Sequence, residues 1–148
     1  MDGMFEELRK QGEALEPKLI RYRRDFHSFP ELKMDTPVTE EKIVSYLRSI
    51  GISEIRTGIG GHGVAAVVRG ALPGKCLAVR ADADGLPIRE ETGLPFAAQN
   101  GNMHACGHDF HMAAALGAAE LVFRHRKQLR GSVKFIFQPY EEGDHGSG

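Results

Sequence analysis

The fold of this chain is decided by the run Lys75-Cys76-Leu77-Ala78-Val79-Arg80-Ala81-Asp82-Ala83-Asp84. Its first six residues are nearly all apolar, which is typical of a strand buried on both faces, so we expect Cys76 to be a core residue. An acidic pair, Asp82 and Asp84, follows this strand directly. Because functional loops of α/β proteins follow the carboxyl ends of strands, the run predicts both a buried sheet and a candidate site.

Hydrophobic periodicity on either side of this run predicts the other elements. Thr36 is a suitable N-cap for the second helix, and Gly51 is a suitable stop signal. Pro17 predicts a kink in the first helix or its division into two pieces. The order is helix, helix, strand, strand, loop, helix, strand, which favours a mixed α/β sheet with helices over its faces. The expected helices are 5–27, 37–50 and 108–126, the expected strands are 64–69, 75–80 and 131–138, and residues 71–74 form a turn.

Composition limits the class of protein. The chain has 148 residues, 41% of them hydrophobic and 26% charged, with a net charge of -1. These values indicate one globular domain with no basic excess for nucleic acid, and no apolar run is long enough to span a membrane. The N-terminus lacks the apolar core of a signal peptide. Two cysteines are too few for a disulfide scaffold, so a reducing, cytoplasmic setting is expected.

A glycine-rich run at residues 58–63 matches the spacing G-x-G-x-x-G of dinucleotide-binding proteins. That motif works only where a helix follows, because the helix N-terminus holds the pyrophosphate. Here the β-like run from Val64 follows instead. We therefore interpret the glycines as a turn that leads into a strand; a helix at Val64 would favour nucleotide binding.

The octapeptide at residues 104–111 contains three of the seven histidines and one cysteine. Cys106 and His108 are two residues apart around a glycine, so in an extended loop their side chains point the same way. A thiolate and an imidazole suit Zn²⁺, Mn²⁺ or Co²⁺. Two alternatives stay open: a capping loop with solvated histidines, and Cys106 as a nucleophile that needs a base held by a third group.

A second acidic pair, Glu141 and Glu142, follows the last predicted strand. One carboxylate of such a pair can bind a cation while the other accepts a proton from the attacking water. Two solvated glutamates in a turn are the alternative. The strand before the pair and the glycine after it favour the functional interpretation.

Four runs of residues together resemble one enzyme family and occur in its order: 24–32, 80–88, 103–109 and 135–143. The resemblance is to the dinuclear metallopeptidases of the aminoacylase and carboxypeptidase G family. The branch is that of hippurate hydrolase, N-acyl-amino-acid amidohydrolases, N-acetyldiaminopimelate deacetylase and auxin-conjugate hydrolases. The resemblance covers about residues 5–148.

The resemblance implies a zinc-exopeptidase-like α/β catalytic domain, a mixed sheet flanked by helices, with two divalent metals per complete site. It implies Cys106, His108 and Glu142 as metal ligands and Glu141 as general base. Asp84 matches an acidic position that orients a ligand or tunes the metals, and we count it with the catalytic residues. Asp82, His104, Asp109 and His111 are expected around the ligands.

The reaction implied is hydrolysis of the amide bond of an N-acyl amino acid, which releases a carboxylate and a free amino acid. Family members continue past Gly148, so residues 1–148 are expected to be the N-terminal part of an incomplete catalytic domain, without the lid or dimerisation domain. The parent is expected to be a homo-oligomer. We expect the chain alone to be inactive or nearly so; the alternative is a non-catalytic metal-binding or interaction module.

Overall fold

The computed structural model describes residues 2–143. The chain runs through a first helical pair, three strands, a long irregular segment, a third helix and a last strand. The elements are α1 (Asp2–His27), α2 (Pro37–Ile50), β1 (Ile55–Ile59), β2 (Gly63–Arg69), β3 (Leu72–Asp82), α3 (His108–Arg124) and β4 (Arg130–Gln138). None of the helices described has the length and hydropathy that crossing a bilayer requires.

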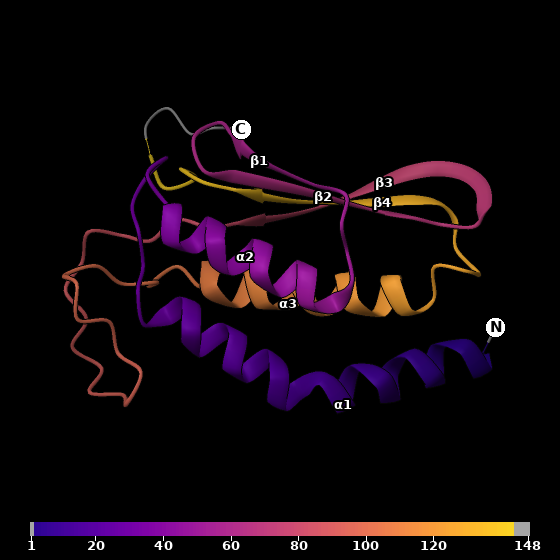
Figure 1. Cartoon of the computed structure of the whole chain (residues 1–148). Helices are drawn as coiled ribbons and strands as arrows, with labels where there is room; N and C mark the ends of the chain where they lie inside the picture. The colour runs from indigo at the N-terminus through magenta and orange to yellow at the C-terminus, as the bar shows by residue number, and fades with distance from the viewer. Residues whose placement is uncertain (1, 144–148) are drawn as a thin grey trace.

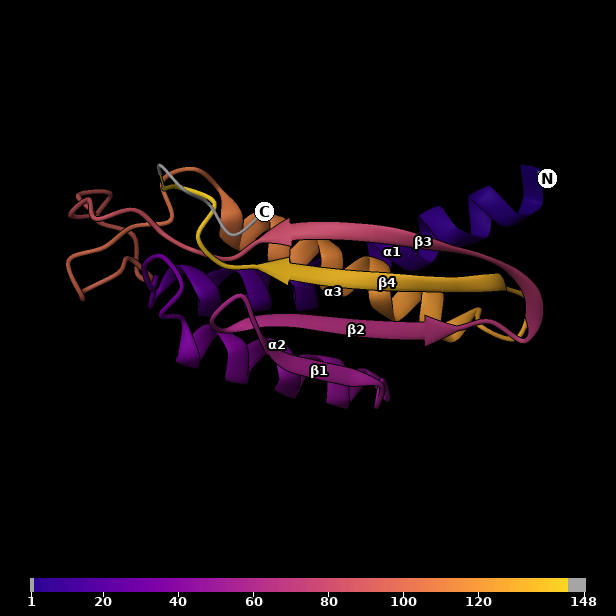
Figure 2. The same ribbon diagram turned by 90° about the horizontal axis from the view of Figure 1, so that it is seen from above.

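The four strands form one mixed sheet in the order β1-β2-β4-β3 (Figure 2). β2 pairs antiparallel with both β1 and β4, whereas β3 pairs parallel with β4. The mixed α/β class predicted from the sequence is confirmed. β1 was not predicted, because its five residues include a glycine and are mostly exposed.

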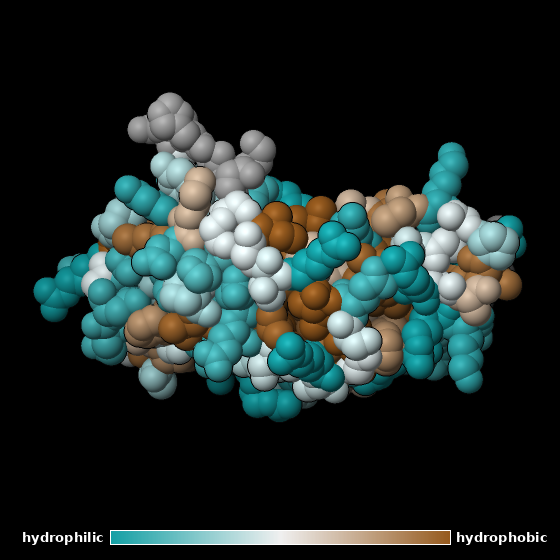
Figure 3. Space-filling view, turned by 45° about the horizontal axis from the view of Figure 1, so that its top comes forward, coloured by the Kyte–Doolittle hydropathy of each residue, from teal (hydrophilic) through white to brown (hydrophobic). Residues whose placement is uncertain are grey.

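All three helices lie on one face of the sheet (Figure 1), whereas the sequence predicted helices over both faces. α2 and α3 pack against the strands, and α1 packs on α3. The core between sheet and helices contains Phe26, Leu47, Met112, Leu116 and Phe135, each with at most 1% of its surface exposed. The opposite face of the sheet carries mixed hydrophobic and hydrophilic side chains (Figure 3).

α1 passes through Pro17 as a single helix, and it bends midway along its length (Figure 1). A proline removes one backbone hydrogen bond and crowds the preceding turn, which accounts for a bend without a break. α1 approaches α3 closely at Gly117, where an added Cβ would lie 2.9 Å from Leu19 Cδ1. The small residues of α3 therefore position α1.

β3 is an edge strand, and the expectation that it is buried on both faces is wrong. Leu77 is 64% exposed, and Cys76, expected in the core, is exposed too. Cys76 pairs with Ser132, and the next residue of β4, Val133, faces the helices. Successive side chains of a strand point to opposite faces, so Cys76 lies on the face that no helix covers. An apolar strand is exposed here because helices cover only one face and no described strand pairs with its outer edge. The strand also begins at Leu72, inside the predicted turn.

α2 has the predicted bounds and ends at Gly51, whose positive φ of 103° suits glycine. Thr36, however, makes no side-chain hydrogen bond as N-cap. Glu31 caps the helix instead: its carboxylate accepts from the amides of Val38 and Thr39 at 3.2 and 2.7 Å. Glu31 lies six residues before the first residue of the helix, so a pattern that considers only the residues next to the helix start does not predict this cap.

Replacing Glu31 with alanine is expected to lower the free energy of unfolding by about 1–2 kcal/mol, because two amides at the start of α2 lose their acceptor. Urea unfolding followed by circular dichroism measures the change. Glu41→Ala, at an exposed position of the same helix, is the matched control and should change stability by less than about 0.5 kcal/mol. Equal effects of the two exchanges would contradict the capping role.

Candidate functional site

The candidate site lies at the carboxyl ends of β3 and β4. These two strands are parallel neighbours, so their ends lie at the same edge of the sheet (Figure 2). Asp82 is the last residue of β3, and Glu141 and Glu142 follow β4. α3 connects the two strands and begins at this edge with His108. The acidic residues at the end of β3, the histidine-rich octapeptide and the acidic pair after β4 therefore meet in space.

Cys106, His108 and Glu142 each offer one ligand atom, and these three atoms lie within 4.8 Å of one another. His108 is buried, Glu142 half-buried and Cys106 exposed. His108 Nε2 lies 3.6 Å from Glu142 Oε1 and 3.6 Å from Glu141 Oε2. A thiol, an imidazole and a carboxylate on one point match the donor types that bind Zn²⁺. The residues present thus fit a divalent cation.

The tautomer of His108 is set by its surroundings. Its Nδ1 lies 2.8 Å from the carbonyl oxygen of Asp84, which can only accept, so Nδ1 carries a proton. Nε2 is left to face the carboxylates. This is the usual arrangement of a metal-binding histidine, in which a bond at one nitrogen orients the other.

The imidazole of His108 and the thiol of Cys106 are both protonated at neutral pH. Burial alone would lower the pKa of His108, but the hydrogen bond with Asp84 and the charge of Asp82 outweigh it and raise this pKa to about 9. A hydrogen bond with Glu142, with some burial and further carboxylates nearby, raises the pKa of the Cys106 thiol to about 11. The cluster is thus a region of excess negative charge that a proton or a cation neutralises.

Asp84 positions the acidic pair. Its two carboxylate oxygens accept from the backbone amides of Glu141 and Glu142, at 3.0 and 3.1 Å. Burial alone would raise the pKa of Asp84, but His108 and these two amides outweigh burial and lower it. Asp84 therefore joins the segment after β3 to the turn after β4 and holds the backbone from which both glutamates project.

Asp84→Asn is expected to lower the free energy of unfolding at pH 7 by about 1–3 kcal/mol, since one amide loses a charged acceptor. Because the pKa of Asp84 is lowered in the folded chain, the stabilisation is present above its unfolded pKa and is lost as pH falls. The difference from the unaltered chain should thus shrink below about pH 4. Urea unfolding at several pH values measures it.

The control for this exchange is Asp35→Asn, because the Asp35 side chain is 91% exposed. It removes the same charge from a position that holds no backbone amide in the described contacts. A difference between Asp84→Asn and the unaltered chain that stays constant from pH 7 to pH 3 would contradict the positioning role.

A second group of donors shares His108. Ligand atoms of Asp82, His108 and His111 also lie within 4.8 Å of one another. Asp82 hydrogen-bonds His111 Nδ1 through one oxygen, and its other oxygen lies 3.7 Å from His108 Nε2. Burial alone would raise the pKa of Asp82, but the two histidines lower it. Nδ1 of His108 is hydrogen-bonded to the carbonyl oxygen of Asp84, so only Nε2 is left to bind a cation. Nε2 can therefore bind a cation with only one of the two described donor groups at a time.

The two remaining residues that the sequence predicted around the ligands, His104 and Asp109, are buried. His104 is 4% exposed, and neither ring nitrogen has a hydrogen-bond partner among the described residues. Burial lowers the pKa of His104 to about 4, so the ring is neutral. Asp109 belongs to neither described donor group and contacts His27 and Arg23. The sequence offered no signal for the contact with His27, which lies 82 residues away.

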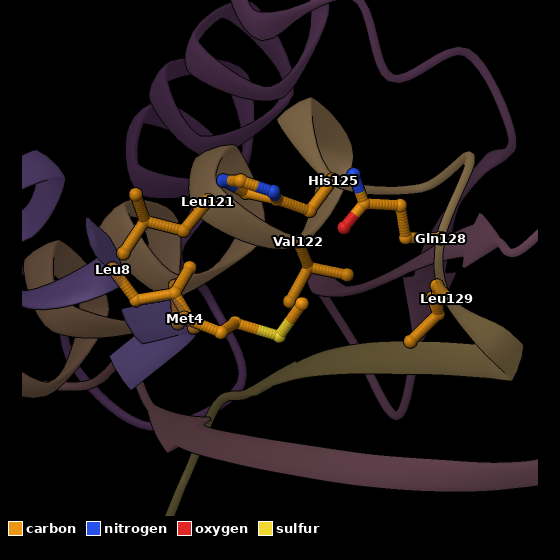
Figure 4. A pocket seen from close by; sticks show the side chains of 8 residues that line it. Met4, Leu8, Leu121, Val122, His125, Gln128 and Leu129 are labelled. Atoms are coloured by element: carbon orange, nitrogen blue, oxygen red, sulfur yellow. The ribbon is translucent and has the colours of Figure 1, made fainter. Parts of the chain in front are cut away.

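An apolar hollow between α1 and α3 is separate from this cluster (Figure 4). Met4, Leu8 and Leu121 line it, with His125 as its one imidazole. His125 Nε2 contacts Gln11 Oε1 at 2.9 Å. Among residues 2–143, no carboxylate or thiol lines the hollow, so these residues offer no donor set for a cation there.

The chain is similar to known proteins in sequence. Residues 78–148 match the sequence profile of peptidase family M20/M25/M40. Over 135 residues the chain is 45% identical to N-acetylcysteine deacetylase of Bacillus subtilis strain 168, a match that covers 87% of this chain and 34% of that protein. Over 129 residues it is 40% identical to N-acetyldiaminopimelate deacetylase of Geobacillus sp. strain WCH70, covering 86% and 34%.

A solved structure is similar as well. A crystal structure from Bacillus subtilis, described as that of a dinuclear metal binding peptidase from the M20 family, matches with a TM-score of 0.85 and 44% sequence identity. The match covers 90% of this chain and 38% of that one. The chain thus spans about a third of the length of the curated relatives it matches.

Proposed function

We propose that the chain belongs to peptidase family M20/M25/M40 and is part of an enzyme that hydrolyses the amide bond of N-acyl amino acids. The observation that carries the proposal is the convergence of Cys106, His108 and Glu142 within 4.8 Å, with Glu141 beside them. The relatives named as deacetylases of N-acetylated amino acids support this substrate class. Hippurate and auxin conjugates belong to the same class as further candidates.

We propose that Cys106, His108 and Glu142 hold a divalent cation, Zn²⁺, Mn²⁺ or Co²⁺, and that residues 1–148 are the N-terminal part of a catalytic domain that holds two. The solved relative described as dinuclear supports the pair. When bound, such a cation polarises the amide carbonyl and makes water a better nucleophile. The reducing compartment and the homo-oligomeric parent expected from the sequence stay predictions.

Glu141 is the proposed general base. Unlike Glu142, it belongs to neither of the two described donor groups, and its side chain is 39% exposed, so substrate can reach it. It takes a proton from the attacking water and returns that proton to the leaving amine. Asp84 holds the backbone amide of Glu141 and so orients the base.

A fragment exchange tests this function. Residues 1–143 would replace the matching third of the Bacillus subtilis N-acetylcysteine deacetylase, and hydrolysis of N-acetylcysteine would be followed by thiol-independent amine detection. We expect turnover, and a loss of about 10²–10⁴-fold in kcat for Glu141→Gln in the chimera. A folded, metal-containing chimera without turnover would contradict the proposal.

One observation favours the second candidate, a metal-binding fragment without turnover. The two described donor groups share His108, so the described residues can use it for one cation at a time. The 148-residue chain alone is therefore expected to bind metal and to leave N-acetyl amino acids and hippurate intact. Turnover by the chain alone that a chelator abolishes would overturn this expectation.

A further inference from the structure

A network of buried charges lies behind the candidate site. His27 Nδ1 is 2.7 Å from Asp109 Oδ2, and His27 Nε2 is 3.0 Å from Glu90 Oε1. The side chains of Asp109 and Glu90 are 0% exposed, and that of His27 is 4% exposed. Each ring nitrogen of His27 thus contacts a different carboxylate, and the ring lies between two fully buried acidic side chains.

This network joins three segments that are distant in the sequence. His27 is the last residue of α1, Asp109 lies in the first turn of α3, and Glu90 belongs to the irregular segment between β3 and α3. Glu90 also accepts from the amide of Ala98 at 2.6 Å, and Arg23 donates to Asp109 at 3.0 Å. His27 is the one group among these that contacts both carboxylates.

The start of α3 depends on this anchor. Its N-cap, Gly107, has a φ of 98° and provides no side-chain hydrogen bond. Within the first turn, Asp109 is the acidic residue, and it is next to the proposed ligand His108. A carboxylate near a helix N-terminus is favourable, but only a held carboxylate fixes the turn in space. What holds Asp109 is His27, together with Arg23.

From this connectivity we propose that His27 is a positioning residue of the cation site: it acts through Asp109 to hold the first turn of α3, and with it His108. The inference rests on the proposed cation site. A side chain at position 27 that cannot reach both carboxylates leaves Glu90 buried with one partner fewer, and it leaves Asp109 with Arg23 and the amide of Phe110. Buried unpaired charges are costly, so the two carboxylates separate and the turn shifts.

The test uses the 148-residue chain and Co²⁺ as the probe. His27→Gln is expected to weaken Co²⁺ binding by about 10-fold or more, because a shifted first turn of α3 moves His108 relative to the other donors. The absorption bands of bound Co²⁺, which report ligand geometry, should shift. The matched control is His125→Gln, which also breaks a contact to α1, that of the residue after α3 with Gln11, and should leave affinity within about twofold.

A double-mutant cycle shows through which residue His27 acts. If it acts through Asp109, the double exchange His27→Gln with Asp109→Asn weakens Co²⁺ binding by less than the product of the two single effects. A purely structural role lowers the melting temperature without cation but leaves the affinity of the folded molecules and the Co²⁺ spectrum unchanged. That result would overturn the inference, and so would full additivity in the cycle.

Should His27→Gln fail to fold, Glu90→Gln provides the same test, since it removes one of the two carboxylate charges and keeps the shape. We expect at least about threefold weaker Co²⁺ binding and the same direction of spectral shift. Unchanged affinity would overturn the inference while the cation site stands. An unaltered chain that binds no Co²⁺ would overturn the proposed function together with the inference.

Discussion

Cys106→Ser is expected to lower the affinity of the chain for Zn²⁺ at least about 100-fold, because removal of an outer partner of a ligand already costs 10–100-fold. Serine keeps the shape of the side chain but does not ionise near neutral pH, so the anionic sulfur donor is lost. The remaining donors, His108 and Glu142, hold a cation less tightly than three. Competition with a chromophoric chelator measures the affinity, and elemental analysis measures the zinc retained after gel filtration.

Cys76→Ser is the matched control for this exchange, since these are the two cysteines of the sequence. Cys76 is exposed on β3, and its thiol contacts the carbonyl oxygen of Leu77 rather than any carboxylate or histidine of the site. Its variant should bind Zn²⁺ like the unaltered chain. Equal metal contents in the two variants would remove Cys106 from the ligand set.

Zn²⁺ affinity is expected to rise about 100-fold per pH unit between pH 6 and pH 8. The pKa values of His108, raised to about 9, and of Cys106, raised to about 11, leave both donors protonated over this range. A cation must displace both protons, and each displaced proton contributes about tenfold per pH unit. Zinc competition titrations at constant ionic strength, with proton release followed by a pH indicator, measure the slope.

The pH dependence has an internal control. Cys106→Ser removes one of the two displaced protons, so the slope of the logarithm of affinity against pH should fall from about two to about one. A slope near zero in the unaltered chain would mean that binding displaces no proton from His108 or Cys106. That outcome would contradict the assignment of both His108 and Cys106 as ligands.

Local pattern accounts for the elements that were correctly predicted. The second helix has the predicted bounds because Pro37 at its first position and Gly51 directly after its last residue are start and stop signals. The run from Val64 is a strand, as the sequence predicted when the glycine motif was rejected as a phosphate site. Alternation and glycine turns act over a few residues, so a single sequence is enough to read them.

The predictions for Cys76 and Thr36 needed knowledge of the neighbours of an element, and both were wrong. Cys76 was expected in the core because its strand is apolar, but the position of β3 at the sheet edge exposes it. Thr36 has the right residue type for an N-cap, yet Glu31 supplies the cap. A local pattern does not encode which face of a sheet is covered or which side chain reaches a helix from elsewhere.

The sequence by itself determined the chemistry of this protein: the residue types, the short spacings such as Cys106 to His108, and the helical and extended segments that carry them. Only the tertiary structure decided which of those groups act together. The parallel pairing of β3 with β4 brings Asp84 to the amides of Glu141 and Glu142, and the packing of α1 on α3 brings His27 to Asp109. Propensity and periodicity depend on residues that are near neighbours along the chain. Hydrogen bonds and charge pairs depend on distances between atoms that the whole fold sets.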